Sequence, residues 1–282
     1  MTRQRISFSI FFIFYLIVSG AGCKRSAYDS PEGYDLDKPR KISLKHNLDE
    51  ISGLCFIPGN EQMVNAIEDE HGKLYSIDLN SGESSSYKFS NRGDYEDLAF
   101  HNNGFFILKS NGHITRFSLP VNGAEPSDVK VMDTLLPKAE YEGMAILNDS
   151  LFVLTKLDNS IDQRGRMKIY RFIISDTSLS AAGTIEPYIT GSIKEGKNKP
   201  AKLHPSCLAK NPADNNWYVI SSINKQLYIL DEKFNLVSLY ELDPRLFRQP
   251  EGLAFTSKGD MLVSNEANGC TATILYFNYS AK

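Results

Sequence analysis

The stretch Gln249-Pro250-Glu251-Gly252-Leu253-Ala254-Phe255 decides the fold, because weaker copies of it recur along the chain. The other copies begin at Glu50, Asp94, Glu140 and His204. Aligned on the residue after the Glu or Ser, the anchors are Gly53, Asp97, Gly143, Cys207 and Gly252, at steps of 44, 46, 64 and 45 residues. Three near-equal steps and one longer step indicate a repeated unit that carries one insertion.

Each copy is followed by two further apolar runs, which are bounded by Gly, Asn and Asp. In the last copy these runs are Asp260-Met261-Leu262-Val263-Ser264 and Ala272-Thr273-Ile274-Leu275-Tyr276. Such short runs are typical of antiparallel strands joined by tight turns. A fourth, less regular strand fits before the next anchor, as in Phe234 to Leu242. Four strands in a unit of about 45 residues predict a blade of a β-propeller. The chain is therefore expected to be all-β, a five-bladed propeller, with a six-bladed ring as the second choice.

The innermost strands should tolerate close approach of neighbouring blades. Two positions after each anchor stand small side chains, and the larger residues between them should face the other way and pack on the next blade. The small residues are Cys55, Ala99, Ala145, Ala209 and Ala254, and the larger ones are Leu54, Leu98, Met144, Leu208 and Leu253. The last blade has only three strands of its own. Ile42 to Lys45 should therefore supply its outer strand and close the ring, which removes the open sheet edges.

Composition and charge describe an ordinary globular chain. The 282 residues are 41% hydrophobic and 23% charged, with a net charge of −3. Residues 1–22 hold Arg3 and Arg5 and no acid, so the remainder is more acidic still. Nucleic-acid binding requires a basic surface, so this function is not expected. The protein is expected to be a monomer.

The N-terminus reads as an export signal. Arg3 and Arg5 precede the apolar run Ile6 to Val18, which is too short to span a bilayer comfortably, and small residues then lead to Cys23. A Cys in that position resembles the lipidated Cys of a bacterial lipoprotein, with plain secretion as the alternative. The expected organisation is a signal peptide at 1–22, a lipidated Cys and flexible tether at 23–37, and the propeller at 38–282. This places the protein in the bacterial cell envelope, attached to a membrane through Cys23.

The three remaining cysteines, Cys55, Cys207 and Cys270, have no spacing typical of a zinc site. Cys55 and Cys207 fall in innermost strands, where a buried small apolar side chain is the expected role. Their disulfide state is not predicted.

Side chains with oxygen ligands gather at one face of the expected disc. In a propeller, the start of strand one and the end of strand two of every blade lie on the same face. The residues just before the anchors are Ser52, Glu96, Glu142, Ser206 and Glu251, and the ends of the second strands add Glu68, Asp69, Lys109, Lys156, Asn265 and Glu266.

Three of the five equivalent positions around the axis are Glu. At separations of about 5 Å and an effective dielectric of about 20, each pair of carboxylates repels by roughly 3 kcal/mol. The cluster therefore requires protons, basic side chains or a cation. The hard oxygen ligands suit Ca²⁺ better than zinc or copper. Glu96, Glu142, Glu251, Glu266, Asp69 and Glu68 are the candidate metal ligands, and Asn265, Ser52, Ser206, Lys109 and Lys156 should face a bound ligand. The alternative is structural: each Glu turns outward or caps a backbone amide.

Several of these segments resemble the SdiA-regulated family of bacterial envelope proteins. They are Glu50-Ile51-Ser52-Gly53-Leu54, Asp94-Tyr95-Glu96, Leu242 to Gly252, Ser264-Asn265-Glu266 and Tyr34 to Pro39. The resemblance implies a five-bladed propeller, distantly akin to NHL-repeat propellers, with a calcium site. In related lactonase-type propellers a Glu before the anchor Gly ligates the central calcium. Glu251, Glu142 and Glu96 occupy that place, while Ser52 and Ser206 depart from the pattern.

Two functions remain open at this point. The first is a calcium-binding propeller without catalytic activity, which presents its loop face to a small molecule or an envelope protein. The second is a calcium-dependent hydrolase of the lactonase, esterase or phosphoesterase type. His204 is a candidate base for the second function, although a single His near a strand start is more often structural. The chain contains no nucleophile elbow, phosphate loop or HExxH motif.

Overall fold

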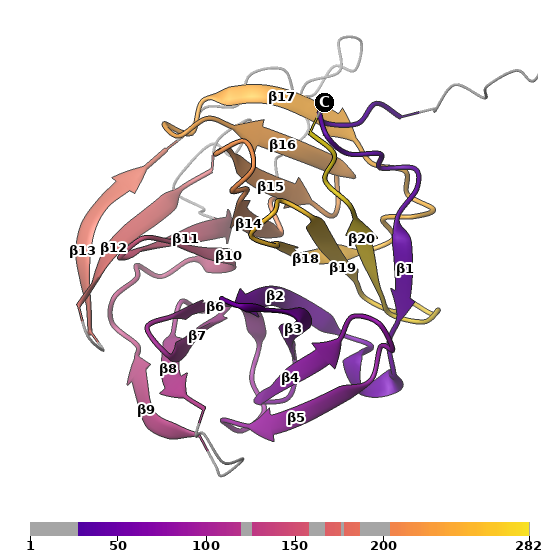
Figure 1. The fold of residues 1–282 in the computed structure, drawn as a ribbon. Coiled ribbons are helices and arrows are strands. Elements are labelled where there is room, and N and C mark those ends of the chain that lie inside the picture. The colour runs from indigo at the N-terminus through magenta and orange to yellow at the C-terminus, as the bar shows by residue number, and fades with distance from the viewer. Residues whose placement is uncertain (1–27, 120–125, 158–166, 176–177, 187–203, 282) are drawn as a thin grey trace, which may run out of the picture.

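The computed structural model describes residues 28–119, 126–157, 167–175, 178–186 and 204–281. The proposed signal peptide and Cys23 lie outside these residues. Five four-stranded antiparallel sheets are arranged around a central axis, with the first strand of each sheet innermost (Figure 1). The expected five-bladed, all-β propeller is confirmed. Beyond the strands, the described residues contain one 3₁₀ turn, His46–Leu48, and no helix among them is long and apolar enough to cross a membrane.

The five blades follow the chain in order, and each is listed from the inside out. Blade 1 contains β2 (Ile51–Ile57), β3 (Asn60–Glu68), β4 (Lys73–Asp78) and β5 (Ser84–Lys88). Blade 2 contains β6 (Tyr95–His101), β7 (Gly104–Lys109), β8 (Ile114–Ser118) and β9 (Ser127–Met132). Blade 3 contains β10 (Glu140–Leu147), β11 (Ser150–Leu157), β12 (Ile169–Ser175) and β13 (Ser178–Ile185). Blade 4 contains β14 (Cys207–Lys210), β15 (Trp217–Ser221), β16 (Gln226–Leu230) and β17 (Leu236–Glu241). Blade 5 contains β18 (Pro250–Phe255), β19 (Met261–Asn265), β20 (Thr273–Phe277) and β1 (Arg40–Ser43).

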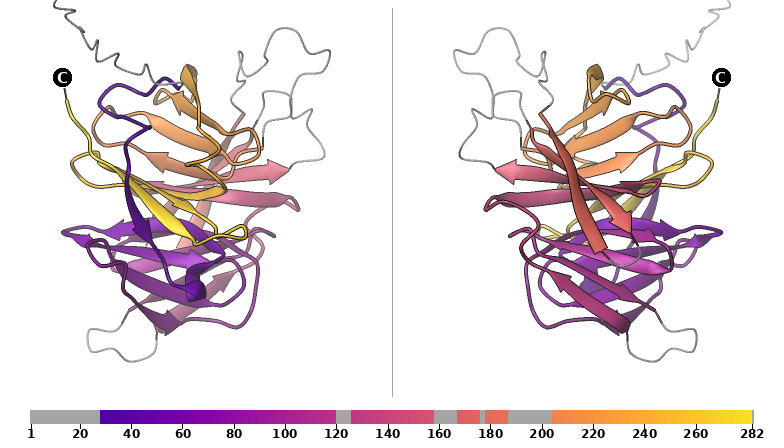
Figure 2. Two further views of the ribbon diagram at one scale, coloured as in Figure 1. Left: turned by 90° about the vertical axis from the view of Figure 1, so that its right-hand side faces the viewer. Right: turned by 90° about the vertical axis from the view of Figure 1, so that its left-hand side faces the viewer.

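The ring is closed by the N-terminal strand, as the sequence predicts. β1 runs antiparallel to β20, with Arg40 opposite Tyr276 and Ser43 opposite Thr273 (Figure 2). The strand begins two residues earlier than expected and ends before Lys45. Because the last blade takes its outer strand from the other end of the chain, the ends of the ring are joined by backbone hydrogen bonds.

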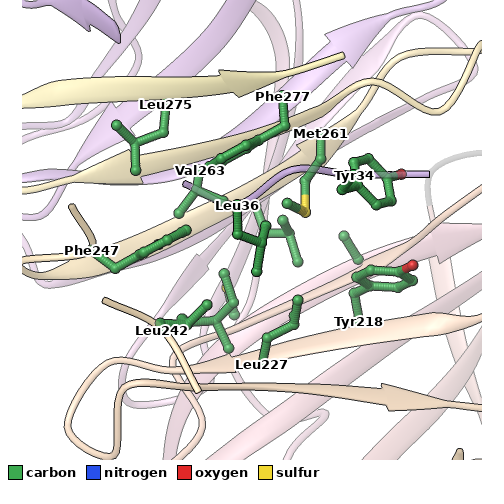
Figure 3. Packing of buried hydrophobic residues seen from close by; sticks show 14 of the residues in the cluster. Tyr34, Leu36, Tyr218, Leu227, Leu242, Phe247, Met261, Val263, Leu275 and Phe277 are labelled. Carbon is green, nitrogen blue, oxygen red and sulfur yellow. The ribbon is translucent and has the colours of Figure 1, made fainter. Parts of the chain in front are cut away.

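The segment before β1 also packs on the propeller. Tyr34 and Leu36 are buried between blades 4 and 5, with Leu36 near Phe247 and Phe277 and Tyr34 near Met261 and Tyr218 (Figure 3). The Tyr34 hydroxyl donates a hydrogen bond to the carbonyl oxygen of Gly259, at 2.5 Å. Residues 34–37 were assigned to the flexible tether from their charge and turn residues, and that assignment is wrong for Tyr34 and Leu36, whose apolar side chains contribute to the core.

The core consists of layers between adjacent blades. In each layer the small residue of one innermost strand lies in the same cluster as the larger residue of the next innermost strand, for example Ala99 with Met144 and Ala254 with Leu54. The larger residue therefore packs on the preceding blade, and the small residue faces the following one. The prediction that the small and the larger residue face opposite blades is confirmed. The prediction that the larger residue packs on the next blade is wrong, because it packs on the preceding one.

Candidate functional site

The motif glutamate is the extra residue of a β-bulge in three blades. In blade 2, Tyr95 lies opposite Lys109 and Asp97 lies opposite Leu108, so Glu96 has no partner on β7. The same shift in register occurs around Glu142 in blade 3 and around Glu251 in blade 5. A bulge bends the strand and redirects its side chains, and bulges are frequent beside functional sites. The repeated sequence therefore produces the same displaced carboxylate in three blades.

The three bulged glutamates share one electrostatic environment. Burial first, and then the charges of Glu142, Asp94 and Glu251 against the opposing effect of Lys156, raise the pKa of Glu96 to about 9. Burial also raises the pKa of Glu142 to about 7, with Lys156 opposing the rise and Glu251 adding to it. The pKa of Glu251 is raised by burial. Glu142 and Glu251 act on Glu96, and Glu251 acts on Glu142, so the three carboxyls lie within electrostatic range of one another.

Lys156 is a cation of this cluster that pairs directly with one of the glutamates. Its ammonium group forms an ion pair with the carboxylate of Glu142, which is only 5% exposed. Glu142, Glu96 and Glu251 together raise the pKa of Lys156 against the effect of burial. Glu251 instead accepts hydrogen bonds from the side chains of Ser222 and Ser206. Lys156 and Ser206 were both predicted to face a ligand, and both contact a motif carboxylate.

Two more predicted acids border the cluster. Burial raises the pKa of Glu266 to about 8, and Glu251, Glu50, Asp69 and Glu142 raise it too. The carboxylate of Glu266 accepts a hydrogen bond from the Gln249 side chain. Burial and four neighbouring acids, Glu50 first, raise the pKa of Asp69 to about 6. At neutral pH, Glu96 and Glu266 therefore hold protons.

Hydroxyl and amide groups link the blades around the axis. The Ser264 hydroxyl donates to the carbonyl oxygen of Ser52 at 2.9 Å, and the Ser52 hydroxyl donates to the carbonyl oxygen of Glu96 at 2.6 Å. Asn265 is fully buried and donates to the carbonyl oxygen of Leu246 at 3.1 Å. Its side-chain oxygen has no hydrogen-bond partner in the described part of the chain, which leaves one buried acceptor available.

Two predicted residues are directed to other contacts. Glu68 is buried, and its carboxylate accepts hydrogen bonds from the backbone amides of Glu70 and His71, at 3.2 and 2.6 Å. This is the structural alternative, in which an acid caps backbone amides in a turn. The Lys109 ammonium lies over the Tyr95 ring, 4.8 Å from its centroid.

His204, the candidate base, lies at the start of blade 4. Its carbonyl oxygen accepts a hydrogen bond from the Ser221 hydroxyl at 2.6 Å, and its backbone amide donates to Asn224 at 3.4 Å. These contacts fix its backbone beside the cluster. They give no direction for the imidazole, so the catalytic role of His204 stays a prediction.

Sequence reasoning missed several members of the cluster. Asp94 raises the pKa of Glu96, Glu142 and Asp69, and Glu50 raises that of Asp69 and Glu266. Both stand two residues before a motif Glu or Ser, so the repeat itself contained the signal. Lys225 was also missed. It donates to the carbonyl oxygens of Ser222 and Arg248, and it lowers the pKa of Glu251.

The anchor in blade 2 has a structural role. The buried Asp97 carboxylate accepts hydrogen bonds from the backbone amides of Leu98 and Met144, at 2.8 and 2.7 Å, and so joins β6 to β10. A side chain on Gly53 would overlap this carboxylate. Burial raises the pKa of Asp97 well above its usual range.

The side chains of this cluster would have to move closer together before they could bind a metal ion. Among the described residues no three His, Cys, Asp or Glu side chains stand close enough together to hold an ion. The chemistry of the donors nevertheless suits a hard cation, because they are carboxylates, hydroxyls and one unpaired amide oxygen. The donor types of these residues therefore suit calcium. In the structure, protons and the Lys156 ammonium supply the positive charge that a bound calcium ion would supply.

Comparison with known proteins supports the fold. No family model matches the chain, and no curated protein matches it. The structure is similar to a glutaminyl cyclase from Myxococcus xanthus, with a TM-score of 0.56 and 14% identity over 86% of this chain and 95% of that one. It is also similar to the soluble aldose sugar dehydrogenase of Escherichia coli, with a TM-score of 0.54 and 12% identity over 87% and 100% of the two chains. A third is the calcium-binding protein regucalcin from Agrobacterium tumefaciens, with a TM-score of 0.51 and 12% identity over 89% and 96%. At these identities the similarity shows the fold alone, and membership of the SdiA-regulated family is not confirmed.

Proposed function

We propose that this protein is a calcium-binding β-propeller of the bacterial envelope, which presents its carboxylate face to a small molecule or a partner protein. The observation that carries the proposal is the set of three bulged glutamates, each of which has a pKa raised above all by burial. Burying like charges together costs free energy in every blade that contributes one, and a bound cation would offset that cost. Regucalcin, a calcium-binding protein of similar fold, supports this proposal by analogy of fold.

The ligand set follows from the contacts. Glu96, Glu142 and Glu251 would contribute carboxylate oxygens, and the unpaired side-chain oxygen of Asn265 would contribute a neutral one. Binding would release the protons held on Glu96 and Glu266 and would break the ion pair between Lys156 and Glu142. Affinity should therefore increase with pH across the neutral range.

Thermal unfolding tests the proposal directly. A ligand that binds only the folded state raises the melting temperature as its concentration increases. The chelated protein should melt at a lower temperature than the protein in excess Ca²⁺, and Mg²⁺ should have a smaller effect because it requires a stricter octahedral site. A melting temperature that does not respond to Ca²⁺, at pH 8 as well as pH 6, would exclude the site.

One observation supports the alternative function, a calcium-dependent hydrolase. The pKa of Glu142 is raised to about 7, which is the range that suits general acid–base catalysis near neutral pH. Lactones, aryl esters and phosphoesters should be assayed with and without chelator, using the wild type, Glu142→Gln and His204→Asn. Turnover that chelator and either substitution abolish would establish the enzyme. Calcium-dependent stabilisation without turnover would favour the binding module.

The envelope location is a separate part of the proposal and rests on the sequence around Cys23. Expression of the full chain in a bacterium should place the wild type in the membrane fraction. Cys23→Ser should move it to the soluble fraction, because a lipid on the thiol is the proposed anchor. Soluble wild-type protein would instead indicate plain secretion.

A further inference from the structure

A cavity lies between blades 3 and 4, on the face of the disc opposite the carboxylate cluster. It has a volume of about 700 Å³, which is within the range of small-molecule sites. It is formed by the β10–β11, β14–β15 and β16–β17 turns together with parts of β12 and β13. Glu142 stands near the start of β10 and Leu147 at its end, so this cavity is distinct from the carboxylate cluster.

The floor of the cavity is aromatic. Trp217 stacks on Phe234 with ring centroids 4.9 Å apart and planes 17° apart, and Phe152 lies 4.8 Å from Trp217. Phe234 has a φ of 62°, a conformation that a bulky side chain rarely adopts. Strained backbone of this kind persists where the surroundings hold it, and it is concentrated at functional sites. The partly exposed Leu147 and Ile185 extend the apolar lining.

The rim of the cavity is basic. Arg171, Lys210 and Lys233 line it, against the single acid Glu232. Arg171 donates to the Ser150 hydroxyl through Nε and one terminal nitrogen, at 3.3 and 3.1 Å. Its other terminal nitrogen has no hydrogen bond to the described residues. The Lys210 ammonium lies 5.0 Å from the centroid of the Trp217 ring, and burial lowers its pKa.

The acidic side chains near the cavity accept hydrogen bonds from residues in or beside the same turns. Glu232 accepts a hydrogen bond from the Asn215 side chain. Asp231 accepts bonds from the backbone amides of Lys233 and Asn235, both at 2.8 Å. Asp214 accepts a bond from the Tyr218 hydroxyl at 2.8 Å. These bonds fix the carboxylates in the turns but leave them charged, and Glu232, Asp214 and Asp231 all oppose the effect of burial on the pKa of Lys210.

We propose that this cavity binds a small organic anion, in which a carboxylate or phosphate meets Arg171 and Lys210 and a flat apolar body lies against the Phe152 side of the floor. Arg pairs with both anions through charge-assisted hydrogen bonds, and a low-polarity floor strengthens such bonds. The apolar body explains why the cations stand beside buried aromatic rings rather than on an open surface.

The chain offers a direct readout, because Trp217 is its single tryptophan. The full chain should be titrated with phenyl phosphate, phenylacetate, benzyl alcohol and inorganic phosphate while its fluorescence is recorded. At least one of the two aromatic anions should give a saturable change, and the stronger of the two identifies the charged group. Benzyl alcohol and inorganic phosphate should bind at least about tenfold more weakly, since each lacks one half of the recognition.

Variants locate the binding. Arg171→Gln should weaken binding of the aromatic anion by about tenfold, because a charge-assisted hydrogen bond is lost. Lys258→Gln is the matched control, since Lys258 is exposed in the β18–β19 turn on the same face and does not line the cavity. The proposal fails if neither anion changes the fluorescence, if benzyl alcohol binds as tightly, or if both substitutions weaken binding equally. None of these results depends on calcium, so they are independent of the carboxylate face.

Discussion

Glu96 and Glu142 show how neighbours set the properties of equivalent residues. Both are bulged glutamates at the same position of the repeat, yet the pKa of Glu96 is raised to about 9 and that of Glu142 to about 7. Lys156 accounts for the difference between the two pKa values, because it forms an ion pair with Glu142 but acts on Glu96 only by its charge, without a direct contact. Glu96 is therefore neutral near pH 7, and Glu142 is poised between its two forms.

Glu96→Gln should stabilise the metal-free protein at pH 8. The folded state holds a proton on Glu96 between pH 4.5, its ordinary pKa, and about 9, while the unfolded chain releases it. Gln keeps the shape and removes this dependence, so the free energy of unfolding should rise by about 1 kcal/mol or more, the value of one pKa unit. Urea denaturation of both proteins at pH 8 and at pH 4 measures this change in the free energy of unfolding. An equal increase at the two pH values would contradict the raised pKa of Glu96.

Lys156→Gln should increase the affinity for Ca²⁺. The Lys156 ammonium occupies the place of a cation beside Glu142, so its removal should strengthen binding by about tenfold, which corresponds to about 1.4 kcal/mol. Lys109→Gln is the control, because that ammonium lies over the Tyr95 ring. Calorimetric titration measures both variants. Weaker binding by Lys156→Gln would mean that the lysine supports the site rather than competes for it.

At the scale of the strand, the glycine of the motif permits blades to meet. A side chain on Gly252 would overlap the carbonyl oxygen of Ser52 in β2, which is backbone and cannot move aside. Gly252→Ala should therefore lower the free energy of unfolding by roughly 3 kcal/mol, the upper end for overpacking.

Gly269→Ala separates this effect from simple conformational strain. Gly269 has a φ of 76° and open space around it, so alanine should cost only about 1 kcal/mol there. Chemical denaturation of both variants gives the comparison. Similar losses at the two positions would show that close approach at Gly252 is not the reason for its glycine.

The strands were readable from the sequence because each carries its own apolar pattern. The innermost strands, the closing strand near Ile42 and the alternation of Leu253 and Ala254 all follow from local spacing. The bulges were not predicted, since a bulge depends on which residue of the partner strand lies opposite. The burial of Tyr34 was missed for a similar reason, because its aromatic partners, Tyr218 and Tyr279, lie more than 180 residues away in the sequence.

At the scale of the molecule, the carboxylate face should make stability depend on pH in an unusual direction. The pKa values of Glu96, Glu266, Glu142 and Asp69 are raised to about 9, 8, 7 and 6. The folded state thus binds more protons than the unfolded chain between about pH 5 and pH 9, so stability should fall as pH rises through this window. Melting temperatures in chelator across these pH values test it, and a rise toward pH 9 would contradict it.

The ring and its acidic face could be inferred from sequence, because rotation carries equivalent positions to a common axis. The balance of charge at that face could not. Lys156 and Ser206 stand at repeat positions, but their pairing with Glu142 and Glu251 depends on which side chains meet across blades, and Lys225 stands at no repeat position that was considered. The pocket at Trp217 was also missed, since it is built from turns of two blades whose side chains differ from those of the other three.

Proton release on metal binding tests the central claim most directly. Ca²⁺ should be titrated into the chelator-treated protein at pH 7.5 in two buffers of different ionisation enthalpy. The observed heats should differ between the buffers by an amount that corresponds to release of one or more protons per ion, because Glu96 must ionise to bind the ion and Glu266 should ionise beside the bound charge. Binding with no proton release, or no binding in either buffer, would contradict a buried carboxylate cluster that exchanges protons for a cation.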